Sequence, residues 1–197
     1  MTSAQPGERD TIATWPNLVT LLRLLCLPVF LWLLFGLENR AAAAWTLGAL
    51  GATDWVDGYL ARRLGQVSEF GKKFDPTVDR LLFIVGLGGI LLDGSMPVWF
   101  GVAVLARELV VGGAVAVGTL AFGMERFDVT FLGKTATLLL MFAIPGFLMG
   151  ASDFPGADGF QLASWILGIP GLVLSYYTAV AYIPLIRDGV RAGRSRR

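Results

Sequence analysis

The sequence predicts an all-α integral membrane protein with six transmembrane helices and both termini on the cytoplasmic side. Three observations lead to this prediction. The 197-residue chain is 55% hydrophobic and only 16% charged, and its mean hydropathy is +0.65. Its apolar segments repeatedly approach the roughly 20 residues that a helix needs to cross a bilayer. The Lys and Arg residues are concentrated on one side of these segments.

The first predicted helix follows a polar N-terminus, residues 1–14, which lacks the apolar core of a signal peptide. Residues 11–15 could begin a short interfacial helix before it. The second helix is the least apolar because it carries Asp54 and Asp57, but residues 41–52 are strongly apolar. The first and the last helix could each include an interfacial extension. The predicted helices are residues 18–37, 41–60, 74–92, 97–122, 131–149 and 162–186.

The basic residues follow the positive-inside pattern. With both termini inside, the outer loops 38–40, 93–96 and 150–161 contain one of the sixteen Lys and Arg residues, Arg40. The inner side receives Arg62, Arg63, Lys72, Lys73, Arg126 and the basic cytoplasmic tail, residues 187–197. The pattern predicts a multi-pass protein of the cytoplasmic membrane, with the connection between the second and third helices on the cytoplasmic side.

The chain contains no internal repeat and no long linker, so residues 1–197 are expected to form a single membrane domain. The net charge of +1 gives no reason to expect nucleic-acid binding. Cys26, the one cysteine, lies in an apolar helix and is expected to pack there. The absence of histidine excludes catalytic triads and metal sites that use it. Proton transfer is therefore left to carboxylates, Lys, Tyr or water.

Four aspartates flank the connection between the second and third predicted helices: Asp54, Asp57, Asp75 and Asp79. Spacings of three and four residues place each pair on one helix face. Residues 65–73 are typical of a turn, which would bring the two helix ends together as antiparallel neighbours. A carboxylate at membrane depth costs about 2.5–3.5 kcal/mol, so the cluster requires cations, partner charges or water. Four carboxylates favour Mg²⁺ or Mn²⁺ and are enough to hold two ions.

Small residues and an arginine accompany these aspartates. Gly58 and Ala61 would leave a shallow wall that a bulky substrate can approach, and Gly71 could do the same from the next helix. Arg62 is placed to bind a phosphate. Ordinary helix packing for the small residues and a role as a topological anchor for Arg62 are the alternatives.

The spacing resembles the full signature of the CDP-alcohol phosphatidyltransferases, and every signature position is matched in Asp54-x2-Asp57-Gly58-x2-Ala61-Arg62-x8-Gly71-x3-Asp75-x3-Asp79. The segment Pro16-Asn17-Leu18-Val19-Thr20-Leu21-Leu22-Arg23 resembles the one that opens the first membrane helix of bacterial members. The resemblance implies six membrane helices, a site that faces the cytoplasm and a homodimer. It also implies that a phosphatidyl group passes from CDP-diacylglycerol to an alcohol, with release of CMP.

The resemblance further implies a role for each signature residue. Asp54, Asp57 and Asp75 would be ligands of a two-metal site that holds Mg²⁺ or Mn²⁺. Asp79 would contact the second metal and act as the catalytic general base on the acceptor hydroxyl. The residues expected to hold the CDP moiety are Asn17, Thr20, Gly58, Ala61, Arg62 and Gly71.

Charged residues elsewhere in the predicted helices are candidates for binding the acceptor alcohol. Arg80 follows Asp79 in the third helix, Arg107 precedes Glu108 in the fourth, and Lys134 lies near the cytoplasmic start of the fifth. Arg107 could instead pair with Glu108 and close the bundle, and Lys134 could be an interfacial anchor. Phosphatidylglycerolphosphate synthases resemble the chain through such an Arg-Glu pair and a Gly-Lys-x-Lys-Thr segment. Here Gly133-Lys134-Thr135 keeps a single lysine, which favours an acceptor with less charge than a dianion.

The favoured acceptor is a glycerol-type alcohol: phosphatidylglycerol, which would give cardiolipin, or glycerol-3-phosphate, which would give phosphatidylglycerolphosphate. Inositol phosphate and serine are alternatives with the same chemistry. An intramembrane prenyltransferase also uses Asp-rich motifs, but it would have more helices and lack the Gly-x2-Ala-Arg continuation. A cation transporter would not require small residues and an arginine at these offsets.

Overall fold

The computed structural model describes the backbone of residues 15–64, 69–124 and 130–195, and the side chains of residues 20–53, 78–119, 121–124 and 130–193. All the regular structure in these ranges is helical, as predicted. A short π-helix, η1 (Trp32–Gly36), continues the first α-helix. The six α-helices are α1 (Trp15–Leu31), α2 (Arg40–Leu64), α3 (Glu69–Asp93), α4 (Val98–Phe122), α5 (Phe131–Gly150) and α6 (Ala157–Ser195).

Each predicted segment corresponds to one helix, but several helices are longer than hydropathy indicated. α3 begins at Glu69, because polar residues such as Lys72 and Lys73 continue the helix beyond its apolar part. α6 has 39 residues, about 58 Å at 1.5 Å per residue, whereas the bilayer core is about 30 Å thick. The suggested interfacial helix at residues 11–15 lies outside the described residues except for Trp15, which begins α1.

Three helices in the described part of the chain are long and apolar enough to cross a membrane: Val98–Thr119, Phe131–Gly150 and Ala157–Gly193. A shorter apolar helical stretch, Thr20–Gly36, belongs to α1 and η1. The six-span topology and the cytoplasmic position of both termini stay predictions.

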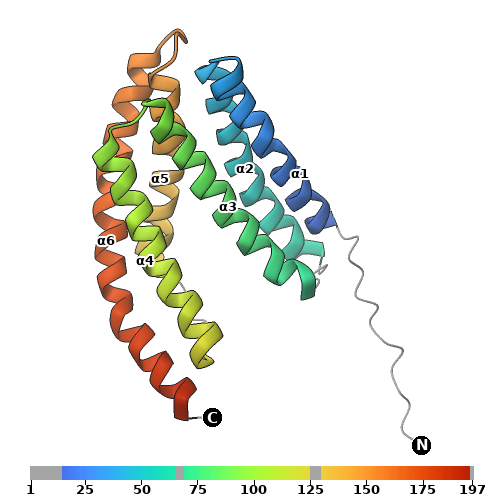
Figure 1. Ribbon diagram of the computed structural model, residues 1–197, viewed down its shortest axis with the longest axis vertical. Coiled ribbons are helices and arrows are strands. Elements are labelled where there is room, and N and C mark those ends of the chain that lie inside the picture. Colours follow the sequence, from blue (N-terminus) through green and yellow to red (C-terminus); the bar gives the residue numbers. More distant parts are fainter. Residues whose placement is uncertain (1–14, 65–68, 125–129, 196–197) are drawn as a thin grey trace, which may run out of the picture.

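The helices form two groups, α1–α3 and α4–α6 (Figure 1). Within the first group α1 packs against α2 and α3, and within the second α6 packs against α4 and α5. Contacts of α2 with α5 and of α3 with α4 join the groups. The ribbons approach each other at the upper end of Figure 1, where connections 37–39, 94–97 and 151–156 lie, and diverge toward the lower end.

Both groups contribute large side chains to one buried core. Phe30, Leu34, Ile90, Phe100 and Phe147 are all fully buried or nearly so. The rings of Phe100 and Phe147 have centroids 5.2 Å apart, a separation typical of favourable aromatic pairs. Many large apolar side chains on the outer helix faces are exposed instead, as lipid contact requires; examples are Leu25, Trp32, Val110, Val173 and Tyr177.

Arg40 ties the two groups together at the upper end. Its Nε donates to Asp93 Oδ2 at 2.9 Å, and its Nη2 donates to Asp93 Oδ1 at 3.4 Å. Its Nη1 donates to the carbonyl of Ala151 at 3.3 Å, just after α5. The hydrogen bond to Asp93 raises the pKa of the Arg40 guanidinium above its usual value, so the link stays charged. The start of α2 is thereby fixed to the end of α3 and to α5.

Candidate active site

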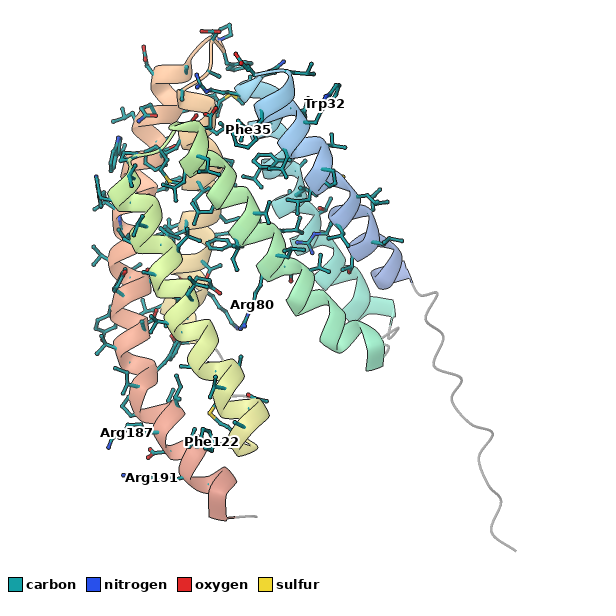
Figure 2. All side chains as sticks on the ribbon, in the orientation of Figure 1. Trp32, Phe35, Arg80, Phe122, Arg187 and Arg191 are labelled. Atoms are coloured by element: carbon teal, nitrogen blue, oxygen red, sulfur yellow. The ribbon has the colours of Figure 1, made fainter. Side chains whose placement is uncertain are left out.

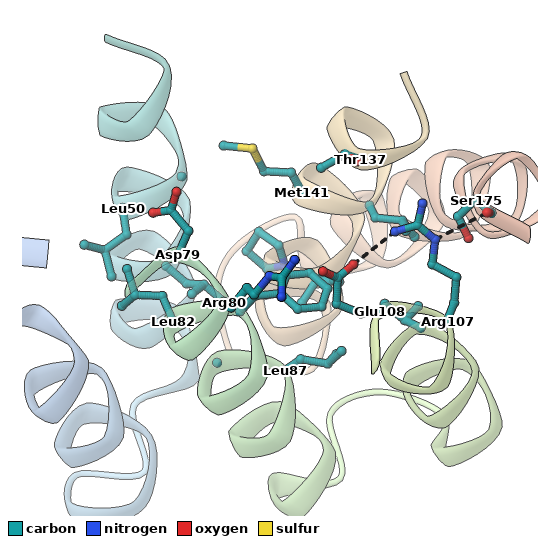
Figure 3. A pocket seen from close by; sticks show the side chains of 18 of the residues that line it. Leu50, Asp79, Arg80, Leu82, Leu87, Arg107, Glu108, Thr137, Met141 and Ser175 are labelled. Atoms are coloured by element: carbon teal, nitrogen blue, oxygen red, sulfur yellow. Dashed lines mark hydrogen bonds and ion pairs between the residues drawn. The ribbon is translucent and has the colours of Figure 1, made fainter. Parts of the chain in front are cut away.

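A cavity of about 350 Å³ lies between the two helix groups. Every α-helix contributes to its wall, and Figure 3 shows the side chains of most of the lining residues. Much of the wall is apolar, but charged groups occur on three helices. The charged lining residues are Arg23 on α1, Asp79 and Arg80 on α3, and Arg107 and Glu108 on α4.

Asp79, the predicted general base, is paired with Arg23. The distance between Arg23 Nη1 and Asp79 Oδ1 is 2.8 Å, and the two side chains are 10% and 40% exposed, respectively. A charged arginine buried in an apolar helix requires such a partner. The ion pair with Arg23 therefore fixes the position of the Asp79 carboxylate, which remains accessible from the cavity.

Arg107 is paired with its neighbour. Its Nη1 lies 3.0 Å from Glu108 Oε2, and its Nε donates to the carbonyl of Ser175 at 3.3 Å. The second contact links α4 to α6. The pairing that the sequence left as an alternative is therefore present, and it occurs on the cavity wall (Figure 3). Arg107 can therefore hold α4 against α6 and at the same time face a ligand in the cavity.

Arg80 is the third of the charged residues that the sequence marked as clues to the acceptor. It projects between the two helix groups (Figure 2), and its Nη1 donates to the carbonyl of Gly112 on α4 at 3.4 Å. Its position next to Asp79 in a predicted membrane helix was the signal that singled it out in the sequence, because charged side chains at membrane depth are usually functional.

Lys134 and Thr20 occupy different environments. Lys134 is exposed in the first turn of α5 and is not among the described side chains that line the cavity. Its role in acceptor binding stays a prediction. Thr20 is buried on α1, one helical turn before Arg23. Since residues three apart share a helix face, α1 presents Thr20 toward the same side as the arginine that lines the cavity.

The other predicted site residues lie on helices, but their side chains are outside the described residues. Asn17 belongs to α1, and Asp75 and Gly71 belong to α3. The remaining ones belong to α2: Asp54, Asp57, Gly58, Ala61 and Arg62. Of the four aspartates only Asp79 has a described side chain, and within the described residues no group of three or more metal-binding side chains occurs.

Comparison with known proteins identifies the family. The family model described as CDP-alcohol phosphatidyltransferase matches residues 13–177. The chain is 34% identical to the cardiolipin synthase (CMP-forming) of Streptomyces coelicolor, over 94% of this chain and 88% of that protein. It is 33% identical to a probable phosphatidylglycerophosphate synthase of Mycobacterium tuberculosis, over 96% of this chain and 93% of that protein.

A third relative has a name that specifies its acceptor. It is the CDP-diacylglycerol–glycerol-3-phosphate 3-phosphatidyltransferase of Bacillus subtilis, which is 31% identical over 77% of this chain and 86% of that protein. The family match covers the signature residues and every residue that lines the cavity. The chain belongs to the CDP-alcohol phosphatidyltransferase family, as the signature predicted.

Proposed function

We propose that the protein transfers a phosphatidyl group from CDP-diacylglycerol to a glycerol-type alcohol in phospholipid biosynthesis, with release of CMP. One observation carries this proposal: Asp79, the last aspartate of the signature, lines a cavity together with Arg80 and Arg107. A carboxylate there can accept the proton of an alcohol, and guanidinium groups beside it can bind phosphate. The names of the relatives in turn favour glycerol-type acceptors.

The four aspartates suit a two-metal site. Leu47, Leu50 and Gly51 form the face of α2 that lines the cavity. Helical periodicity continues this face through Asp54, and the face of α3 that carries Asp79 through Asp75. The donor set of Asp54, Asp57, Asp75 and Asp79 consists of carboxylate oxygens, which favour Mg²⁺ or Mn²⁺. Such ions, when bound, would neutralise the diphosphate and stabilise the attacking and leaving oxygens.

We assign the CDP moiety to the part of the first helix group that carries the four aspartates. Its proposed ligands come from all three helices of that group: Asn17, Thr20, Gly58, Ala61, Arg62 and Gly71. Glycine and alanine let a nucleotide approach the backbone closely, while Arg62 can bind a phosphate through two parallel hydrogen bonds. The position of Thr20 one turn from Arg23 is consistent with a nucleotide beside the cavity.

Asp79 is proposed to accept the proton from the acceptor hydroxyl. The acceptor would lie in the cavity, where Arg107 is a candidate ligand of its polar group. Lys134, which is exposed in the first turn of α5, is the second candidate and would have to reach the acceptor from outside the described cavity wall. The two glycerol-type acceptors are phosphatidylglycerol, with cardiolipin as product, and glycerol-3-phosphate, with phosphatidylglycerolphosphate as product. Among the described residues nothing specifically favours inositol phosphate or serine.

We further propose that the protein lies in the cytoplasmic membrane, with the lower end of Figure 1 on the cytoplasmic side. Acidic residues prevail near the upper connections, where Glu38, Asp93 and Asp153 lie, whereas Arg187 and Arg191 lie at the lower end (Figure 2). This distribution agrees with the positive-inside rule. A homodimer is proposed from the family resemblance.

Acceptor-dependent CMP release tests the function. The purified protein in phosphatidylcholine nanodiscs would receive CDP-diacylglycerol and Mg²⁺, together with phosphatidylglycerol, glycerol-3-phosphate, inositol phosphate or serine. CMP and a new phospholipid are expected with a glycerol-type acceptor. Folded protein that binds CDP-diacylglycerol but forms no product with either glycerol-type acceptor would contradict the proposal.

A further inference from the structure

We propose that Arg80 binds the phosphate of the acceptor and that this acceptor is a lipid phosphodiester with a single negative charge. The inference rests on the proposed function and assigns the substrate class and a specificity-determining residue to the same site. Three observations support it: the contacts of Arg80, the pairing of the other cations on the cavity wall and the apolar character of that wall.

Arg80 reaches across the cavity from α3 toward α4. Its guanidinium lies over Gly112, where a Cβ atom would be 3.4 Å from Arg80 Cζ and Nη2. Its Nη1 donates to the carbonyl of the same glycine at 3.4 Å. The side chain is exposed, and one weak backbone contact leaves most of the five guanidinium N–H donors available for a ligand.

The other two arginines on the cavity wall are already compensated. Arg23 is paired with Asp79, and Arg107 is paired with Glu108. Arg80 forms no ion pair with any carboxylate in the described part of the chain. The described charged side chains of the cavity therefore leave one positive charge unmatched, and it belongs to Arg80. One negative charge on the ligand would balance it. A phosphodiester carries one such charge, whereas a phosphomonoester carries more than one.

The position of Arg80 separates it from the proposed nucleotide site. The residues assigned to CDP all lie on α1, α2 and the start of α3. The guanidinium of Arg80 points the other way, toward α4 and the side on which Glu108 lies (Figure 3). Because Asp79 and Arg80 line the same cavity, a phosphate bound to Arg80 would hold its glycerol within reach of the carboxylate that accepts the proton.

The apolar wall indicates that the acceptor is a lipid. Glycerol-3-phosphate is polar throughout and would leave this surface without a partner, whereas the part of a lipid next to its headgroup can cover it. Apolar residues from four helices line the cavity beside the charged ones: Leu50, Leu82, Leu87, Val104, Leu140 and Ile144. The combination of one available cation and an apolar wall matches a ligand such as phosphatidylglycerol.

The test measures CMP release in phosphatidylcholine nanodiscs with CDP-diacylglycerol and Mg²⁺, while phosphatidylglycerol or glycerol-3-phosphate is varied. Wild type is compared with Arg80→Gln, Arg80→Lys and the matched control Arg187→Gln, which makes the same change on the exposed lower part of α6. A charge-assisted hydrogen bond lost in Arg80→Gln should raise the KM for phosphatidylglycerol roughly 10- to 100-fold. The KM for CDP-diacylglycerol should stay nearly unchanged.

Arg80→Lys should lie between wild type and the glutamine variant, because lysine keeps the charge but loses the planar fork. The control should resemble wild type. Three outcomes would overturn the assignment while the proposed function stands: an unchanged acceptor KM in Arg80→Gln, an equal rise in both KM values, or a lysine variant as impaired as the glutamine variant. Turnover of glycerol-3-phosphate but not of phosphatidylglycerol would overturn the phosphodiester acceptor. Absence of CMP from folded wild type with both acceptors would overturn the proposed function itself.

Discussion

Arg23 on α1 and Asp79 on α3 form an ion pair in which Nη1 and Oδ1 are 2.8 Å apart. The arginine side chain is almost completely buried, whereas the aspartate faces the cavity. α1 thus holds the last signature aspartate in position. The pairing also explains how a charged residue in an apolar helix is tolerated, since each charge offsets the other.

We expect Arg23→Gln to lower kcat for CMP release roughly 10- to 100-fold, the range typical of a displaced catalytic group. Glutamine can still donate a hydrogen bond, but it lacks the positive charge that holds the Asp79 carboxylate in place. Arg23→Lys should restore part of the activity because it returns the charge. Thermal unfolding of both variants in detergent would separate misplacement of Asp79 from loss of the fold. A folded Arg23→Gln variant with wild-type kcat would contradict a positioning role.

Asp79→Asn should abolish turnover while much of the CDP-diacylglycerol binding remains. The amide has nearly the same shape but cannot accept the proton of the acceptor hydroxyl. Binding of CDP-diacylglycerol, followed by fluorescence or calorimetry, and CMP release should therefore separate in this variant. Turnover at the wild-type rate would refute the role of Asp79 as base.

Asp57→Ala should weaken metal and nucleotide binding together, because Asp57 would hold a metal ion that, when bound, neutralises the diphosphate. A titration of CMP release against Mg²⁺ should show a higher half-saturating concentration than in wild type, and chelation of the metal should stop the reaction in both. An unchanged Mg²⁺ dependence in the variant would exclude Asp57 as a ligand.

Hydropathy and spacing predicted the fold well because both depend on local sequence. In the described part of the chain six α-helices follow one another in the predicted order, and the signature led to the family. The lengths of α2, α3 and α6 were underestimated at their lower ends, because charged residues there lower the hydropathy without breaking the helix.

Contacts between distant residues could not be predicted in the same way. The pair of Arg23 with Asp79 and the reach of Arg80 to Gly112 depend on how α1, α3 and α4 pack, which a single sequence does not encode locally. Adjacency made the pair of Arg107 and Glu108 a candidate, but only the packed helices show that it also contacts α6 and the cavity.

The buried aromatic cluster provides a test of the packing itself. Phe147 on α5 is fully buried, and its ring centroid lies 5.2 Å from that of Phe100 and 5.0 Å from that of Trp165. Phe147→Ala should destabilise the protein by about 3–5 kcal/mol, because it leaves a cavity where α4, α5 and α6 meet. Phe142→Ala is the matched control, since Phe142 lies on the same helix and is 59% exposed. Unfolding in a denaturing detergent series should show a large shift for the first variant and little for the second, while similar shifts for both would contradict the packing of α5 against α4 and α6.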